Sequence, residues 1–342
     1  MKNIFFFLIM CSCISINTYA QFSYPIQKVA IEFQKRTLIV ELQEKDEKYM
    51  TKLKKKDGEE AVDNYVSNID NYNRLVKESF PKYWKTTPFE FKTKEETDDI
   101  VKSGDKKYAV FSAGWRAEKR KQGTDVYIEF EVYCFTTYLA EKAKKRDKYY
   151  SDNQGSMNIT RGPHVFKLSL ASKPVSEADF KFIIQQFQLH TEKATTIGKT
   201  GGIWKTAFFI PDISFKAKKI LKEKKLSIPK DYIDFGEPEI KEVYKHPFEL
   251  TASEKEEQLI LDDSKEYAYI NYVWSEKQQY WAIIVVDIES GEILARIGIG
   301  GVNVAVFGIP TGLDRYAPII SYRSKIFFKL NHLKAINRFI GK

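Results

Sequence analysis

Histidine, cysteine and glycine are placed in this chain in ways that bear on metal, thiol and phosphate chemistry. The histidines lie far outside metal-ligand spacing, and no His-Glu-x-x-His motif occurs. Cys134 lies in an alternating, strand-like stretch, which indicates a buried structural thiol. The glycine-rich run 297–301 lacks the spacing and the Lys-Ser/Thr of a phosphate-binding loop. We therefore expect neither a metal nor a cofactor. The histidines are His164, His190, His246 and His332.

Paired carboxylates are the remaining catalytic option. Glu129 and Glu131 alternate along a predicted strand, and Asp262 and Asp263 follow a predicted helix. Neither pair recurs at the equivalent position of the internal repeat described below, and acids on exposed strands are usually solvated. Two acids would have to converge in one cleft to hydrolyse a polymer. A carboxylate-dependent hydrolase of envelope polymers is therefore the alternative function.

A second group of candidate residues recurs at one spacing. When the sequence is shifted by 159 positions, residues 88–115 match residues 247–274 at eight of 28 positions, where roughly two matches are expected by chance. The matches include Glu90 with Glu249 and Trp115 with Trp274. Aromatic side chains near loops can stack on sugars or flank a partner, so we take these four as candidate binding residues. Structural roles, core capping for the tryptophans and a shared bond for the glutamates, are the competing interpretation.

The repeat predicts an α/β fold built from two tandem copies of a β-α-β-α-β-β-(β)-α unit, each a sheet with helices packed on it. Local signals support several elements of each copy. Thr93 with Glu96 and Thr251 with Glu254 have the spacing of helix capping boxes. The predicted elements are strands 37–42 and 206–210, a helical arm ended by Pro81, strands 88–91 and 247–250, strands 108–112 and 267–271, hairpin partners 125–137 and 280–287, and final helices from Ser176 and over 325–340.

The first twenty residues have the organisation of a secretory signal peptide. Lys2 precedes the apolar stretch 4–16, which is too short to span a bilayer, and small residues precede Gln21 at the −3 and −1 positions. We expect cleavage before Gln21 without lipid on Cys11 or Cys13. No later stretch is long and apolar enough for a transmembrane segment.

These features divide the chain into four parts: a signal peptide at 1–20, a first α/β repeat at 21–190, a linker at 191–202 and a second α/β repeat at 203–342. The linker is predicted from its Thr-Thr and Gly-Gly pairs. One cysteine remains after cleavage, so packing rather than an internal disulfide must stabilise the mature chain. An exported chain without disulfides suits a bacterial envelope.

The Lys/Ile/Asn/Tyr-rich composition and the Tyr19-Ala20-Gln21 cleavage end resemble the uncharacterised exported proteins common in Bacteroidota. The resemblance implies export and carries no functional motif. We expect an exported, non-enzymatic cell-envelope protein, periplasmic, outer-membrane associated or secreted. It would be a binding or structural module that docks on a partner protein or a cell-wall polysaccharide. Nucleic acid is not expected as a partner, because export removes the chain from it.

The net charge of +9 is spread over lysine runs mixed with acids and apolar residues. Such runs usually form solvated helix faces, and the alternative is a footprint for anionic lipid or polymer. The C-terminal helix predicted over 325–340 illustrates the choice, because its apolar stripe is flanked by Lys and Arg. We expect it to cover its own sheet, and peripheral contact with a membrane is the alternative.

Overall fold

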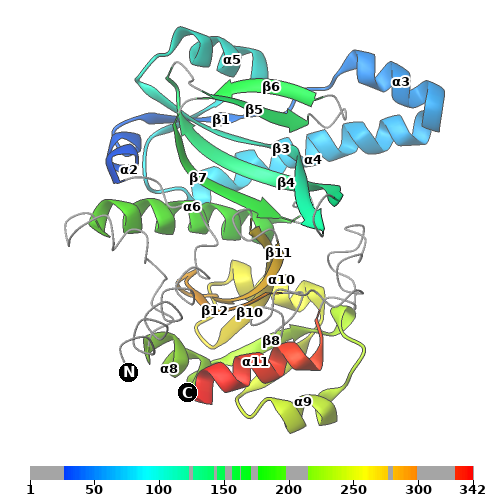
Figure 1. Cartoon of the computed structure of the whole chain (residues 1–342), viewed down its shortest axis with the longest axis vertical. Coiled ribbons are helices and arrows are strands. Elements are labelled where there is room, and N and C mark those ends of the chain that lie inside the picture. Colours follow the sequence, from blue (N-terminus) through cyan, green and yellow to red (C-terminus); the bar gives the residue numbers. More distant parts are fainter. Residues whose placement is uncertain are drawn as a thin grey trace, which may run out of the picture.

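The computed structural model describes residues 27–122, 126–141, 145–150, 156–161, 163–170, 176–197, 215–275, 280–298 and 328–341. Two stretches of chain, which we call unit one and unit two, repeat the same series of elements, one above the other in Figure 1. Unit one holds α2 (Gln27–Phe33), β1 (Thr37–Glu41), α3 (Glu47–Asp57), α4 (Glu59–Tyr83), β2 (Phe89–Lys92), α5 (Lys94–Ser103), β3 (Tyr108–Gln122), β4 (Val126–Leu139), β5 (Lys145–Tyr150), β6 (Ser156–Arg161), β7 (His164–Leu170) and α6 (Glu177–Ile197). Unit two holds α8 (Phe215–Glu223), β8 (Lys225–Pro229), the short 3-10 helix η2 (Lys230–Tyr232), α9 (Glu237–Val243), β9 (Phe248–Thr251), α10 (Ser253–Leu261), β10 (Tyr267–Ser275), β11 (Tyr280–Asp287), β12 (Ile293–Gly298) and α11 (Leu330–Gly341).

Both units have the same sheet topology. The strand order is β7-β4-β3-β1-β2 in unit one and β12-β11-β10-β8-β9 in unit two. In each unit the first strand is parallel to both of its neighbours. The other three strands of the sheet path, β3-β4-β7 in unit one and β10-β11-β12 in unit two, pair antiparallel as a meander. The two sheets join where β7 pairs with β10 at Ser169 and Trp274. The predicted fold class, two tandem α/β units with helices packed on a sheet, is confirmed.

The strand registers place the sequence repeat at the level of single residues. The aligned rows are Leu38–Phe89–Ala109 in unit one and Leu226–Phe248–Ala268 in unit two. The second and third members of each row are 159 residues apart, as in the sequence match. The first members, Leu38 of β1 and Leu226 of β8, are further apart in sequence, because the connection from β1 to β2 is much longer than the connection from β8 to β9.

A β-bulge recurs at the same step of both meanders. In unit one it lies between Thr137 and Tyr138 of β4, and in unit two it lies between Val285 and Val286 of β11. In each unit the bulge lies directly before the residue that pairs with the alanine of the aligned row, which is Leu139 opposite Ala109 in unit one and Asp287 opposite Ala268 in unit two. Bulges re-aim strands and are kept within related sheets, so this shared irregularity supports a common origin of the two units.

The first strand of unit two differs from the prediction. The counterpart of β1 is β8, whereas the predicted strand 206–210 lies outside the described residues. Leu226 and Ile228 of β8 are fully buried between β9 and β10. A central strand is selected by pairing with two neighbours, which local β-propensity does not reveal. Pro229 ends this strand.

One of the two predicted capping boxes forms. Thr93 accepts from the Glu96 amide at 3.2 Å, and the Glu96 carboxylate accepts from the Thr93 amide at 2.8 Å. The predicted box at Thr251 and Glu254 is wrong, because α10 begins at Ser253. The Thr251 hydroxyl is buried at the end of β9 and lies 2.6 Å from the Ser227 hydroxyl. A side chain that bridges two strands is unavailable to cap the helix.

The Pro-Phe-Glu motif that recurs at 88–90 and 247–249 predicts that Phe89 and Phe248 are buried. This prediction is wrong, because the two residues occupy equivalent positions but are only half-buried. Each lies on the outermost strand of its sheet, β2 or β9. Phe89 packs against Phe80 and Phe91, with ring centroids 5.8 and 5.5 Å apart. An edge strand has a neighbour on one side only, and this leaves part of each ring in contact with solvent.

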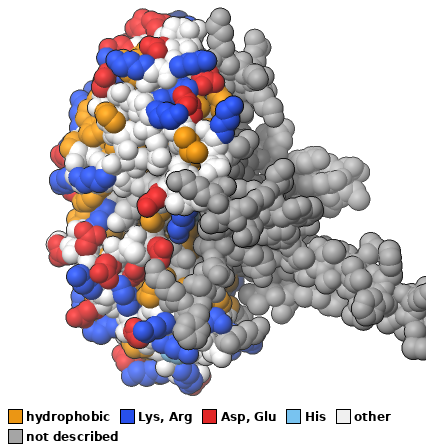
Figure 2. Space-filling model, turned by 90° about the vertical axis from the view of Figure 1, so that its left-hand side faces the viewer, with side chains coloured by type: hydrophobic (Ala, Val, Ile, Leu, Met, Phe, Trp, Pro, Cys, Tyr) orange, Lys and Arg blue, Asp and Glu red, His pale blue; other side chains and the backbone are white. Residues whose placement is uncertain are grey.

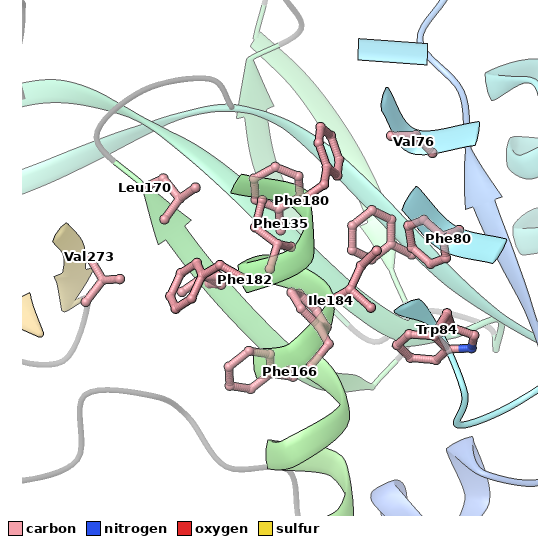
Figure 3. Packing of buried hydrophobic residues seen from close by; sticks show 14 of the residues in the cluster. Val76, Phe80, Trp84, Phe135, Phe166, Leu170, Phe180, Phe182, Ile184 and Val273 are labelled. Carbon is pink, nitrogen blue, oxygen red and sulfur yellow. The ribbon is translucent and has the colours of Figure 1, made fainter. Parts of the chain in front are cut away.

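Helix α6 is the structural link between the units. Its residues Phe180, Ile183, Ile184 and Phe187 pack with α2, α4 and the sheet of unit one, in a cluster that also contains Ile284 and Val286 of β11. Figure 3 shows α6 between Phe80 and Trp84 of α4 on one side and Val273 of β10 on the other. The opposite face of the unit-two sheet packs against α8, α9 and α11. One helix therefore completes the core of its own unit and covers a face of the next.

The helix α6 also corrects the predicted linker 191–202. It continues through Ile197, so the first part of that linker is helical. Thr191 and Ala194 are buried, and the hydroxyl of Thr191 donates to the Phe187 carbonyl at 2.7 Å. Back-bonding of this kind lets threonine occupy a helix that its branched side chain otherwise disfavours. Residues 198–214 lie outside the described residues.

The C-terminal helix α11 covers its own sheet, as expected. It begins at Leu330, and its buried stripe consists of His332, Leu333, Ile336 and Ile340. Phe328, just before the helix, is fully buried in the same cluster. In the described part of the chain, none of the helices has the length and apolar character needed to span a bilayer.

Candidate binding site

Unit one carries three insertions that unit two lacks. The helices α3 and α4 stand where unit two has only η2 and α9. β3 and β4 contain 15 and 14 residues, whereas β10 and β11 contain 9 and 8. The hairpin β5-β6 replaces a tight turn at Gly291. In repeat proteins, segments that the shared fold does not need are frequently the binding surfaces.

The most clearly defined insertion is a helical arm, residues 46–69, formed by α3 and the first part of α4. Asp46 caps α3 by accepting from the Tyr49 amide at 2.9 Å. Gly58 separates the helices with φ +88°, a conformation that other residues rarely adopt. α3 buries no residue and rests on α4 through the rings of Tyr49 and Tyr65, 5.0 Å apart. Figure 1 shows it projecting from the sheet, so it contributes little to the core.

A polar clamp fixes the base of the arm. The Gln43 amide donates to the Asn73 side-chain oxygen at 2.9 Å, and the Asn73 side-chain nitrogen donates to the Gln43 carbonyl at 2.9 Å. The Gln43 side chain also donates to the Tyr133 hydroxyl of β4 at 2.5 Å. Lys45 and Asp70 add an exposed ion pair at 2.9 Å. The arm is therefore held in one direction relative to the sheet.

The surface of the arm carries both charges. The lysines of α3 are all exposed, but acids at the start of α4 stand next to them. Lys54 bonds Glu59 at 2.5 Å, and this hydrogen bond raises the pKa of Lys54. Met50 and Leu53 are half-buried among these charges. Such a surface can form ion pairs and apolar contacts with a partner, as the rim of a protein interface does.

A small cleft lies at the junction of the units, between α6, α10 and β10. Its volume is about 50 Å³, room for a few water molecules. Ser176 and Asp179 bond each other reciprocally at 3.2 and 3.3 Å at the start of α6, and Glu256 accepts from Ser227 at 2.5 Å. Burial, followed by the charges of Glu256 and Asp179, raises the pKa of Tyr269. Two of the carboxylates therefore serve the architecture. The polar lining consists of Ser176, Asp179, Ser253, Glu256, Glu257, Tyr269, Asn271 and Tyr272.

Beside this cleft, Lys181 of α6 caps the end of α10. Its side chain is 2% exposed, and Nζ donates to the carbonyls of Ile260 at 2.5 Å and Leu261 at 3.2 Å. It also pairs with Asp263 at 2.8 Å. A cation at a helix C-terminus satisfies free carbonyls and complements the helix dipole. The sequence signal for this contact was a single lysine in the apolar run 180–184.

The predicted pair Glu90 and Glu249 is equivalent in backbone position but not in contacts. Glu249 accepts from the Tyr267 hydroxyl at 2.5 Å and also bonds Lys255. The Lys255 bond, then that of Tyr267, lowers the pKa of Glu249. Glu90 is exposed and lies 3.8 Å from Lys92. The structure does not bring Glu90 and Glu249 together, because each lies on the outer strand of its own sheet.

The predicted pair Trp115 and Trp274 occupies equivalent strand positions. Each is the eighth residue of its strand, and they pair with Tyr133 and Trp281 of the neighbouring strands. On its other side Trp274 pairs with Ser169, which places its backbone at the seam between the two sheets. The side chains of both tryptophans lie outside the described residues. Among the described pairings, the two positions therefore differ in their second neighbour.

The other candidate residues are dispersed over the fold. Glu129 and Glu131 lie in the extended part of β4, in register with Lys119 and Ala117 of β3. Within the described ranges, no cluster of three or more His, Cys, Asp or Glu side chains could hold a metal ion. Cys134 is fully buried. The glycine-rich run ends β12 at Gly298, and the rest of it lies outside the described residues.

No family model matches the chain, and comparison with curated proteins and with solved structures gave no significant match.

Proposed function

We propose that this protein is an exported, non-enzymatic module of the cell envelope that binds a partner protein or a cell-wall polymer through the arm of unit one. The supporting observation is that α3 buries no residue, has no counterpart in unit two and is nevertheless held in a fixed direction by Gln43, Asn73 and Tyr133. Ordering a helix costs conformational entropy, and this helix recovers little of it through core burial. Contact with a partner explains its retention.

The construction of the arm suits recognition. A surface that is already ordered binds with less loss of entropy than a flexible loop. The rigid base comes from the two-unit scaffold, because Tyr133 lies in the fully buried centre of the unit-one sheet. Export rests on the signal-like segment 1–20, and an envelope location is where an exported bacterial chain would meet such a partner.

A photo-crosslinking experiment tests the proposal. A photoreactive amino acid replaces Lys52 on α3 of the full-length, exported protein, and the matched control replaces Lys102 on α5, which is also exposed. We expect a discrete crosslinked product from position 52 and none from position 102. Excess protein without the photoreactive amino acid should compete for the partner and abolish the product from position 52. Protein in which a short Gly-Ser linker replaces 46–62 should not compete for the partner. Equal crosslinking at both positions would contradict a role for the arm.

The carboxylate-dependent hydrolase remains the second candidate, because the junction cleft brings Asp179 of unit one close to Glu256 and Glu257 of unit two. Glu257 is the best choice for a test, since Asp179 and Glu256 take part in structural bonds. Purified protein would be incubated with dye-labelled cell-wall polymer beside a Glu257→Gln variant. Release of dye by the unchanged protein and loss of release in the variant would favour the enzyme over the binding module.

A further inference from the structure

Two adjacent helices of unit two, α8 and α11, are rich in positive charge. α8 carries four lysines and one glutamate, and α11 carries Lys334 and Arg338 without an acid. Together they hold a net charge of +5. In Figure 2, which views the molecule from the side on which α8 lies, Lys and Arg side chains are numerous at the lower end.

Contacts show that the two helices form one continuous surface. The Lys218 ammonium lies 5.7 Å from the ring centroid of Phe339, so a residue of α8 sits directly on α11. Lys219, Lys222, Lys334 and Arg338 are exposed. We call this surface, Lys218, Lys219, Lys222, Lys334 and Arg338, the α8–α11 face. The α8–α11 face points away from the sheet of unit two, because the apolar stripe of α11 on the opposite side is buried against that sheet.

The charges of this face are less compensated than those of other lysine-rich helices. On α3, Lys54 is paired with Glu59 at 2.5 Å, and further acids follow in the first turn of α4. On the α8–α11 face the single acid, Glu223, lies 4.0 Å from Lys219, and both side chains are largely exposed. Two of the three acids of neighbouring α9 are engaged locally, because Glu237 pairs with Lys241 and Glu239 accepts from the Gly236 amide. The third, Glu242, is exposed.

Apolar groups lie among these cations. Ile220, Leu330 and Phe339 are half-buried at the edges of the two helices. Cations mixed with partly exposed apolar side chains on helices that lie parallel to a surface are typical of proteins that rest on membranes. A polysaccharide site would instead present stacked aromatic faces and many neutral hydrogen-bond donors. The composition of this face therefore favours lipid.

We infer that the α8–α11 face docks on a membrane surface rich in anionic lipid. The contact is peripheral, because the apolar stripe that could insert is already used in the core of unit two. Each Lys or Arg near an anionic leaflet strengthens binding about fivefold, so five of them give a measurable and salt-dependent affinity. This inference shares the envelope location with the proposed function but does not use the arm.

Vesicle co-sedimentation tests the inference with the full-length mature protein. The probe is a phosphatidylglycerol/phosphatidylcholine vesicle, compared with pure phosphatidylcholine at low and high salt. The test variant is Lys219→Glu, Lys222→Glu, Lys334→Glu and Arg338→Glu, and its matched control is Lys48→Glu, Lys52→Glu, Lys55→Glu and Lys56→Glu on α3. We expect the test variant to lose at least about 100-fold in affinity and the control to change less than about threefold. A second variant carries Gln at the four positions, which removes the charges without reversing them. It should also lose affinity, so the inference remains testable if the charge reversals disturb folding.

The outcomes separate the possibilities. Salt-sensitive binding that depends on anionic lipid and is lost only in the α8–α11 variants supports the inference. Absence of binding to anionic vesicles at low salt, or equal loss in the α3 control, overturns it. Binding to a soluble polyanion such as polyglutamate without binding to vesicles also overturns it and indicates a polymer ligand. The protein in which a linker replaces 46–62 should still bind vesicles, so failure of the arm proposal is distinguishable from failure of this one.

Discussion

Replacement of Lys181 by methionine is expected to loosen the junction between the units. Methionine keeps most of the apolar stem but removes the ammonium that serves the carbonyls of Ile260 and Leu261. Loss of a donor to a buried acceptor costs about 1–3 kcal/mol. The Asp263 side chain is 59% exposed, so its ion pair adds little. We therefore expect Lys181→Met to lower the free energy of unfolding by about 2–4 kcal/mol.

Urea unfolding followed by tryptophan fluorescence measures this loss. Lys102→Met on α5 is the control, because that side chain is 74% exposed, and it should change stability by less than about 0.5 kcal/mol. Asp263 has φ +52°, and the equivalent position in unit one is Gly104 with φ +71°. Adding Asp263→Gly to Lys181→Met should therefore recover about 1 kcal/mol. If Lys181→Met is no more costly than Lys102→Met, Lys181 does not hold α10 in place.

Three further outcomes are expected. Burial, and then the positive charge of Lys193, lowers the pKa of His190 to about 3, below the unfolded value of 6.5. His190 therefore contributes stability above pH 6.5 that is lost as the pH falls toward 3. Between pH 7 and pH 4 the free energy of unfolding of the unchanged protein should fall by about 3 kcal/mol more than that of the His190→Gln variant. Parallel curves of unfolding free energy against pH for the two proteins would refute this. Gly291→Ala should cost about 1–3 kcal/mol in urea unfolding, because φ is +69° and the new Cβ would lie 3.0 Å from the Gln185 side-chain oxygen, and an unchanged midpoint would be inconsistent with this turn. The buried hydroxyl of Tyr244 has no hydrogen-bond partner among the described residues, so Tyr244→Phe should leave the melting temperature unchanged or raise it, whereas a clear fall would reveal a partner.

Local signals in the sequence predicted only part of the local structure, because the capping box at Thr251 does not form and α4 continues past Pro81, its predicted end, to Tyr83. The capping box at Thr93 and Glu96 and the start of α6 at Ser176 and Asp179 need only neighbours within three residues, and both form. The repeat was visible because β2, α5 and β3 keep an ungapped spacing with β9, α10 and β10. These elements follow one another along the chain in both units, so insertions elsewhere in the sequence did not disturb the match.

The features that the sequence did not reveal depend on distant partners. β8 is a central strand because β9 and β10 flank it, and its own run of five residues ends in proline. The role of Lys181 depends on a helix end 79 residues away. The arm was predicted as a helix, but its clamp joins Gln43 to Tyr133 on a strand 90 residues away. Neither periodicity nor spacing encodes such pairings.

The sharing of α6 by both sheets has a consequence for synthesis. Phe182 is made about one hundred residues before Val286, with which it shares a core. At roughly 5–20 residues per second, one side of the helix waits about 5 to 20 seconds for the sheet that covers it. During that interval unit one holds an uncovered apolar surface. The chain is therefore expected to be most prone to aggregation after residue 197 has been made and before the strands of the second meander pair.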